Sequence, residues 1–238
     1  MSSDNTIYYL TYENIIDTNI LFNDIYSNEN TNYYFSDDFS KDFYIHLARC
    51  GFISTTTIHE DKLFLLPELQ FEYALLDFKD LHISKKVEKL IRKDAYEFKI
   101  NTRFDEVLNK IDEYHNPNWL IGDYHKLLLS LREKDDSIAD FSIMSVEIID
   151  KQTKELISAE IGYKIYDTYT SLTGFSSKEK KYNNYGKLQL VLLALYLKKE
   201  NYAFWNLGHP YMQYKFDLGA KKYSRDDFLK RWLPKVFI

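Results

Sequence analysis

The segment from Lys187 to Lys199 constrains the fold most, because it is apolar over most of a helical surface. Its apolar residues include Leu188, Leu190, Val191, Leu192, Leu193, Leu195 and Leu197. A helix that is apolar around most of its circumference is packed on both sides. We therefore expect this helix to be covered by other elements on both sides.

The residues before this helix follow a period of two, which is typical of β-strands. Residues 143–148 alternate, residues 150–154 are turn-like, and residues 156–166 and 169–175 continue as strands, so we expect an antiparallel meander. A strand at 202–207, a short helix near 211–216, the turn Leu218-Gly219-Ala220 with a last strand, and a helix from Ser224 follow the apolar helix. This is the element order of an acetyltransferase-like (GNAT) domain. The expected class is α+β, with a mixed sheet and flanking helices.

The first eighty residues have a different character. Short β-rich stretches at 7–10, 32–35, 63–66 and 73–78 surround one helical segment, Lys41 to Arg49, which follows a good N-cap at Ser40 and ends before Gly51. We expect a small α+β domain over residues 1–80 and the GNAT-like domain over residues 81–238.

Charge separates the same two parts of the chain. Residues 1–80 hold fourteen acidic side chains and four basic ones, whereas residues 81–238 hold twenty-two acidic and twenty-seven basic ones. The segment Ser84–Lys93 reads as an amphipathic helix whose basic side chains share one face: Lys85, Lys89, Arg92 and Lys93. Helices are also expected at 104–111 and 123–133. A basic face can attract phosphate even in a protein of net charge -5.

Several classes of protein are excluded by what the sequence lacks. It has no run of eighteen apolar residues and no basic, then apolar, N-terminal signal, so we expect a cytoplasmic protein without a membrane partner. The single cysteine, Cys50, has apolar neighbours and is expected to be a buried packing residue. No His, Cys and carboxylate cluster has metal-ligand spacing, and no P-loop or serine-nucleophile elbow occurs.

The loop before the apolar helix is a candidate anion site. Asn183, Asn184, Gly186 and Lys187 lie where unpaired amides and the positive end of the helix dipole converge. A phosphate of coenzyme A or of a tRNA end would suit this position. The alternative is that these residues form a turn and cap the helix.

A family resemblance adds to this picture. Leu81-His82-Ile83-Ser84-Lys85-Lys86 resembles the Leu-His-Ile-Ser-Arg-Ser stretch of the leucyl/phenylalanyl-tRNA-protein transferases. Further segments match in order: Ala48–Phe52, Ala74–Leu76, Asn118–Leu120, Tyr124–Leu127, Ser145–Glu147, Leu156, Gly162, Phe175-Ser176 and Leu218–Ala220. The resemblance covers about residues 35 to 232.

The resemblance implies transfer of an amino acid from an aminoacyl-tRNA to the amine of a protein N-terminus or a similar acceptor. It implies no metal, no cofactor and no DNA. Such an enzyme positions the amine, removes its proton and stabilises an oxyanion. The basic face of helix 84–93 would bind tRNA phosphates, and Trp119 would stack on the terminal adenine.

The chain departs from the family pattern at two places. The family's acidic residue falls on Leu172, in a substrate-binding segment that continues through Thr173 and Gly174. The family's Asp-Cys-Gln segment corresponds to residues 206–209 of this chain, Asn-Leu-Gly-His, which is one residue longer. The chemistry has therefore moved, or the activity is different or absent.

Other residues are candidates for the displaced chemistry. His209 suits a general base, Asn206 a hydrogen-bonding group, and Tyr211 a proton donor, although each type also serves in turns or packing. Glu160 is either a structural carboxylate or a ligand of a substrate amine. Two alternatives remain open: an acyl-CoA-dependent N-acyltransferase, and a binding module of the same fold without catalysis.

Overall fold

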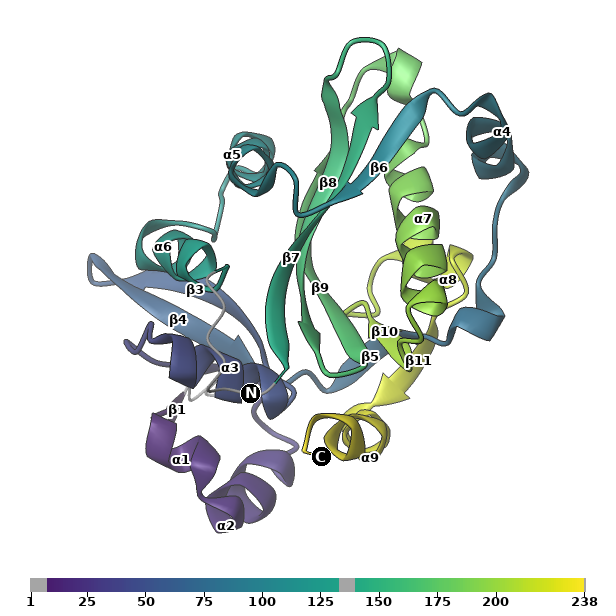
Figure 1. The fold of residues 1–238 in the computed structure, drawn as a ribbon. Helices are drawn as coiled ribbons and strands as arrows, with labels where there is room; N and C mark the ends of the chain where they lie inside the picture. Colours follow the sequence, from purple (N-terminus) through teal and green to yellow (C-terminus); the bar gives the residue numbers. More distant parts are fainter. Residues whose placement is uncertain (1–7, 133–139, 238) are drawn as a thin grey trace, which may run out of the picture. The chain divides into compact units, whose positions relative to one another are not determined.

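The computed structural model describes residues 8–132 and 140–237, which contribute to two compact units (Figure 1). Unit 1 comprises residues 1–73, 117–139 and 223–238, and unit 2 comprises residues 74–116 and 140–222. Neither unit is a continuous stretch of sequence. Their boundaries therefore differ from the sequence-based partition at residue 80.

Unit 1 contains short helices and strands. They are β1 (Tyr8–Tyr9), α1 (Tyr12–Ile16), α2 (Thr18–Ile20), the π-helix η1 (Leu21–Tyr26), β2 (Tyr34–Phe35), α3 (Lys41–Arg49), β3 (Ile53–His59), β4 (Lys62–Glu68), α6 (Gly122–Ser130) and α9 (Arg225–Val236). Strands β3 and β4 form an antiparallel hairpin. Helix α3 has the predicted bounds, because the Ser40 hydroxyl accepts a hydrogen bond from the Phe43 N–H and Gly51 takes a φ of +90° beyond its end.

Unit 2 is built on a seven-stranded mixed sheet. Its strands are β5 (Glu72–Leu76), β6 (Tyr96–Ile100), β7 (Phe141–Asp150), β8 (Leu156–Ile165), β9 (Thr168–Ser176), β10 (Phe204–Asn206) and β11 (Lys221–Ser224), in the order β11-β5-β10-β9-β8-β7-β6. Its helices are η2 (Phe78–Asp80), α4 (Lys85–Lys93), α5 (Phe104–Tyr114), η3 (Lys180–Tyr182), α7 (Tyr185–Lys199) and α8 (Gln213–Asp217). The boundaries between the units fall within β5 and β11.

The meander predicted from the alternating pattern is confirmed as β7, β8 and β9, which pair antiparallel. The β8–β9 ladder contains one irregularity, because Ile161 pairs with Thr173 while Gly162 pairs with Ser171. Leu172 is therefore an extra residue in β9, at a β-bulge. Bulges re-aim the side chains beside them.

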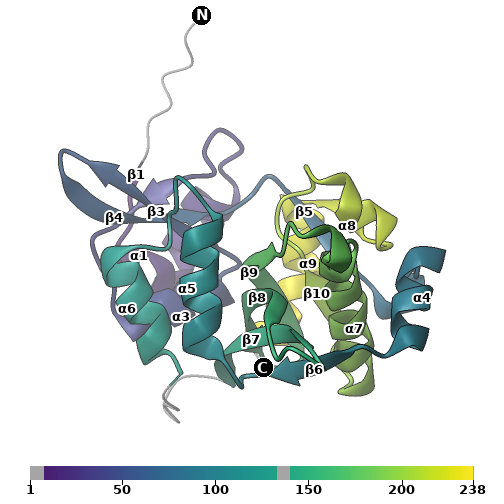
Figure 2. The ribbon, with the colours of Figure 1, turned by 90° about the horizontal axis from the view of Figure 1, so that it is seen from above.

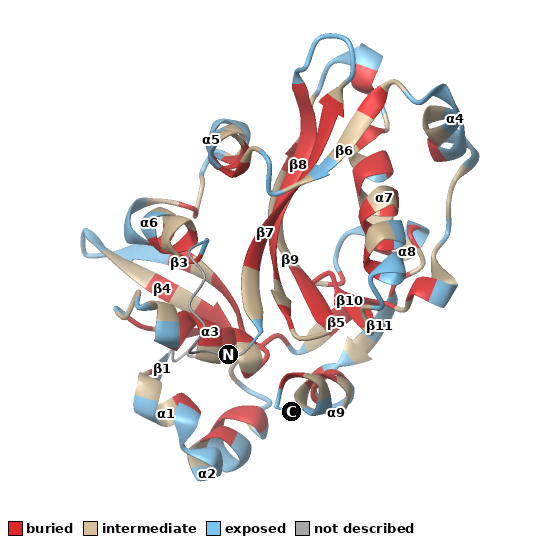
Figure 3. Cartoon of the chain, in the orientation of Figure 1, coloured by how far each residue is buried: buried red, intermediate tan, exposed pale blue. Residues whose placement is uncertain are grey.

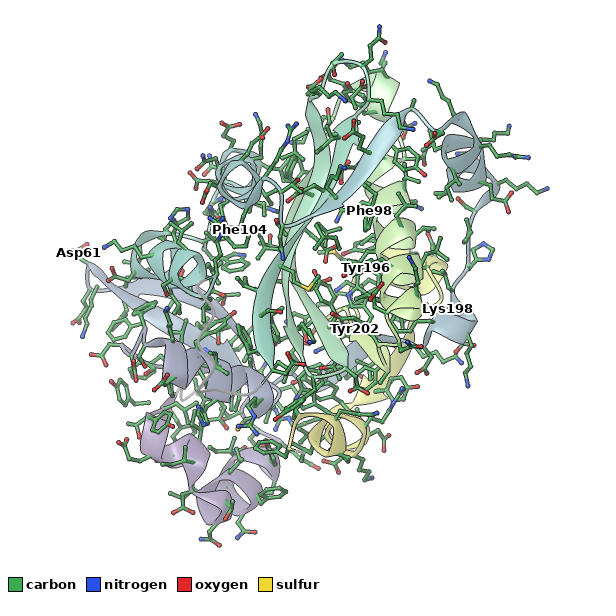
Figure 4. The ribbon with its side chains drawn as sticks, in the orientation of Figure 1. Asp61, Phe98, Phe104, Tyr196, Lys198 and Tyr202 are labelled. Atoms are coloured by element: carbon green, nitrogen blue, oxygen red, sulfur yellow. The ribbon has the colours of Figure 1, made fainter. Side chains whose placement is uncertain are left out.

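Helix α7 covers one face of this sheet, and α5 lies on the other face (Figures 1 and 2). The core on the α7 face includes Leu188, Leu193 and Leu197 of the helix and Val146 and Ile148 of β7. Figure 3 shows the buried residues running along most of β7 and β8. Toward the edge of the sheet, Phe98 of β6 and Tyr196 of α7 face one another, with ring centroids 6.1 Å apart (Figure 4).

The predicted helices are found, with shifted ends. Helix α7 begins at Tyr185, so Gly186 and Lys187 lie in its first turn rather than in a loop. Helix α5 extends to Tyr114, and α4 begins after the predicted N-cap Ser84. The helices α1 and α2, η1 and the strands β3 and β6 were not anticipated from the sequence.

Candidate functional site

Strands β9 and β10 part within the unit 2 sheet. They pair in parallel at three positions, Phe204 with Thr168 through Asn206 with Thr170. Strand β9 continues to Ser176, whereas β10 ends at Asn206. The parting leaves residues 171–176 of β9 without a partner in β10. The first turn of α7 approaches the end of this segment, because a Cβ atom added to Gly186 would lie 3.1 Å from the Ser176 Oγ.

A buried polar network lies beside this opening, on the face covered by α7. Glu160 of β8 is 5% exposed. One of its oxygens accepts hydrogen bonds from the Tyr169 hydroxyl at 3.0 Å and the Ser171 hydroxyl at 2.8 Å, and the other accepts one from the Gln189 amide at 3.1 Å. The Trp205 indole N–H donates to the Ser171 Oγ at 2.9 Å. The network therefore joins three strands and α7.

Burial sets the charge of this carboxylate. It raises the pKa of Glu160 to about 7, against the lowering effects of the Ser171 and Tyr169 hydrogen bonds and of the positive charge of Lys215. Glu160 forms no ion pair with a Lys, Arg or His in the described part of the chain. At neutral pH its side chain is consequently divided between the protonated and ionised forms.

Lys215 of α8 supplies a second buried charge. Its ammonium donates to the backbone carbonyls of Leu207, at 2.5 Å, and His209, at 2.7 Å. Burial lowers the pKa of Lys215 to about 8, although the nearby Glu160 raises it. Tyr214, the residue before it, has a pKa raised to about 12, mainly by burial and also by the charge of Glu160. Lys215 thus ties the segment after β10 to α8.

The three predicted catalytic residues lie at the end of β10 or just beyond it. Asn206 is buried, and its side-chain oxygen accepts a hydrogen bond from the Gly208 N–H at 2.9 Å, which closes a turn. His209 is half-buried, and its ring stacks on that of Tyr211 at 4.8 Å between centroids. Tyr211 is 79% exposed. His209 and Tyr211 are therefore adjacent, while the Asn206 oxygen is engaged by the turn.

The predicted substrate-binding residues on β9 surround the bulge. Leu172, Thr173 and Gly174 are all half-buried. His115, which follows α5, bonds through its Nε2 to the Gly174 carbonyl at 2.9 Å. Glu160 pairs in register with Gly174 and accepts a hydrogen bond from the Ser171 hydroxyl, so a carboxylate lies beside the bulge at Leu172.

Trp119 belongs to unit 1, whereas the other predicted site residues belong to unit 2. It is half-buried, its backbone carbonyl accepts a hydrogen bond from the Thr56 hydroxyl, and its ring lies 5.6 Å from that of Tyr124. Its local environment is therefore that of a partly exposed aromatic residue on a loop.

The predicted phosphate-binding residues fall on two helices. The four basic side chains of α4 are exposed: Lys85, Lys89, Arg92 and Lys93. At the amino end of α7, Asn183 is exposed and Asn184, with a φ of +70°, precedes the helix without a side-chain cap bond. Lys187 forms an exposed ion pair with Asp217 at 3.3 Å. The α4 face thus presents its charge to solvent, while Lys187 already has an anionic partner.

A pocket of about 240 Å³ lies between the start of α4, α7 and α8. Its lining residues are His82, Ser84, Val87, Lys187, Leu190, Val191, Tyr214, Asp217 and Leu218. Tyr214 therefore lines this pocket and also lies within electrostatic reach of Glu160.

The described residues include no group of three or more His, Cys, Asp and Glu side chains placed to hold a metal ion. Within the same residues, no helix combines the length and the apolar character needed to span a membrane. Cys50 is buried, as expected, and burial raises the pKa of its thiol to about 12.

Comparison with known proteins identifies the family. The model of the leucyl/phenylalanyl-tRNA protein transferases matches residues 75–232, which include every strand of the unit 2 sheet in whole or in part and the network around Glu160. The chain belongs to this family. A leucyl/phenylalanyl-tRNA–protein transferase of Flavobacterium johnsoniae is 28% identical over 159 residues, covering 65% of this chain and 69% of that protein.

Solved structures show more distant similarity. L-PGS from Bacillus licheniformis matches with a TM-score of 0.42 and 13% identity, over 74% of this chain and 51% of that one. The chain therefore spans about half the length of that protein. FemX matches with a TM-score of 0.46 and 10% identity, over 82% of this chain and 71% of that one.

The structure also shows what residue-by-residue reasoning missed. Tyr169, Ser171, Gln189 and Lys215 were not singled out, although each touches Glu160 or the segment after β10. One signal was present in the sequence. Between Leu188 and Leu197, every residue except Gln189 and Tyr196 is aliphatic. A polar residue kept inside a buried helix requires a hydrogen-bonding partner.

Proposed function

We propose that this protein transfers an amino acid from an aminoacyl-tRNA to an amine, either a protein N-terminus or a small amine, in the cytoplasm. The observation that carries the proposal is the family match over residues 75–232 together with the carboxylate of Glu160 beside the bulge at Leu172. The missing acid of the family is thereby replaced by an acid from the neighbouring strand.

The fold supports this assignment. The meander, the parting of β9 from β10 and the amino end of α7 beside that opening are the features of an acetyltransferase-like (GNAT) domain. On this proposal, that domain carries the chemistry and residues 1–80 contribute a smaller α+β part. The exposed basic face of α4 binds tRNA phosphates without reading sequence.

The reaction exchanges an ester for an amide. The acceptor nitrogen attacks the carbonyl carbon of the aminoacyl ester, the C–N bond forms, and the C–O bond to the ribose breaks. The nitrogen loses a proton and the ribose oxygen gains one. His209 accepts the proton that the nitrogen loses, since an imidazole nitrogen can act as a general base, and Lys215 holds the segment that carries His209. Glu160 binds an amine of the substrate.

The test uses a mixture of tRNAs charged with radiolabelled amino acids and a peptide with an N-terminal Lys or Arg. We expect label to enter the peptide, acetyl-CoA not to substitute as donor, and tRNA binding to weaken steeply with salt. His209→Ala should lower transfer by at least about 100-fold, the usual range for a general base, whereas the exposed His59→Ala serves as the matched control. Absence of transfer from every charged tRNA would refute the proposal.

A further inference from the structure

The pocket between α4, α7 and α8 lies within unit 2 and has an apolar floor. Val87, Val191 and Leu218 are each no more than 5% exposed, and Leu190 is half-buried. The pocket volume of about 240 Å³ is below the roughly 300 Å³ at which sites for drug-sized ligands begin. The pocket therefore suits one ring system or one side chain rather than a whole cofactor.

Two hydroxyl groups line this pocket and have protons to donate. The Ser84 Oγ accepts a hydrogen bond from the Val87 N–H, and Tyr214 is half-buried. Within the described ranges, residues 8–132 and 140–237, neither hydroxyl donates a hydrogen bond. Sheltered donors of this kind favour a ligand that brings acceptors, because a donor left unmatched on binding is costly.

The chemistry of the lining separates two kinds of ligand. A hydrocarbon side chain would offer the two hydroxyls no acceptor, whereas every nucleobase carries carbonyl oxygens or ring nitrogens that accept hydrogen bonds. His82 and Tyr214 also give the lining two planar rings. Unpaired bases stack on aromatic side chains, histidine included. The lining therefore favours a nucleobase over an aliphatic side chain.

The segment beside the pocket is rich in positive charge. Residues 82–93 supply three of the lining residues and hold five Lys and Arg side chains against one Glu. Lys85 and Lys86 are exposed. The lining includes one carboxylate, Asp217, whose exposed ion pair with Lys187 contributes little stability. A phosphate therefore competes for Lys187 at low cost.

From this geometry we infer that the pocket holds one unpaired base of the single-stranded end of the donor tRNA, and that Lys85 and Lys187 bind the phosphate beside that base. The inference rests on the proposed aminoacyl transfer and names where the donor is held. Transfer RNAs end in unpaired CCA. Because the terminal adenine is expected to stack on Trp119, the pocket takes one of the two cytosines before it.

The test is fluorescence anisotropy with a 5′-labelled RNA, ACCA, and with the same RNA lacking one or the other cytosine base but keeping its phosphates. We expect loss of one cytosine base to weaken binding at least about fivefold, the lower end of what stacking of one base contributes. Leu190→Trp, which fills the pocket, should weaken binding of intact RNA by the same factor and abolish the difference between the RNAs. Leu195→Trp, on the exposed side of the same helix, should change neither.

Two milder variants keep the test valid if Leu190→Trp does not fold. Tyr214→Phe removes one donor, so it should weaken binding of intact RNA and leave unchanged the binding of the RNA that lacks the recognised cytosine. Lys187→Met removes a phosphate contact, so it should weaken binding of all three RNAs alike. It should also reduce the slope of log affinity against log salt by about one.

The outcomes separate this inference from the proposed function. Equal binding of the three RNAs by the natural protein would overturn the pocket assignment even where aminoacyl transfer is observed. So would binding of leucinamide that Leu190→Trp abolishes, or tighter binding in the pocket of adenosine 3′,5′-bisphosphate, the nucleotide part of coenzyme A. Absence of transfer from every charged tRNA would refute the proposed function, while base-selective binding of ACCA would still support the pocket.

Discussion

Two buried carboxylates of unit 2 show how differently the two faces of one sheet use the same group. Glu147, on the face of α5, accepts hydrogen bonds from the backbone N–H groups of Thr102 and Arg103, each at 3.0 Å, and from the Thr102 and Ser145 hydroxyls. Glu160, on the face of α7, receives side-chain donors alone.

This difference in hydrogen-bond donors indicates which carboxylate is structural. The Glu147 carboxylate, which projects from β7, lies at the amino end of α5, where unpaired amides and the helix dipole favour a negative charge. Among the described residues, Glu160 has no backbone donor and no ion-paired cation, and burial raises its pKa. The carboxylate of Glu147 is therefore held by backbone donors at a helix end, whereas that of Glu160 depends on side-chain donors.

The largest expected effect is at Glu147. Glu147→Gln places an amide N–H group opposite backbone donors, which loses charge-assisted bonds and leaves buried N–H groups unsatisfied. We expect a loss of about 3 kcal/mol in the free energy of unfolding, measured by urea denaturation. A loss of less than about 1 kcal/mol in the free energy of unfolding would contradict the assignment of Glu147 as a structural carboxylate.

A smaller effect, with a pH dependence, is expected at Glu160. Its folded pKa is raised to about 7, so the folded state binds a proton more tightly than the unfolded state, and the resulting stability is lost as pH rises from 5 to 8. The stability of Glu160→Gln relative to the natural protein should rise by about 2 kcal/mol over that interval. A constant difference across this range would contradict the description of Glu160 as a carboxylate without a charge partner.

The smallest effect is expected at Lys215. Lys215→Met leaves two carbonyls without their donor, but it also removes a buried ammonium, so we expect a net loss of about 1 kcal/mol. Removing this positive charge should raise the pKa of Glu160 further. An unchanged pH profile of stability in Lys215→Met would show that the two charges are not coupled.

Sequence periodicity predicted the elements that rest on local patterns. The alternation before Asp150 and after Glu155 gave β7, β8 and β9, and the nearly continuous apolar surface gave α7. Strands β3 and β6 escaped notice because polar residues such as Thr55–Thr57 lie where an apolar alternation was sought. Propensity alone is a weak guide there, since pairing with a partner strand decides the outcome.

The site was less predictable than the fold. Glu160 was selected as a buried carboxylate or an amine ligand, but its partners come from residues 9, 11 and 29 positions away, brought together by the sheet and α7. Lys215 carries no sequence signal of burial, because lysine is almost always exposed. Contacts of this kind follow from tertiary packing.

The most direct test is the pKa of Glu160 itself, measured by carboxyl ¹³C NMR titration of protein labelled at glutamate, with Glu160→Gln to assign the resonance. The account predicts a midpoint near 7. A midpoint at or below 4.5, the ordinary value for this side chain, would mean that Glu160 already has its charge partner within the protein and would contradict the account.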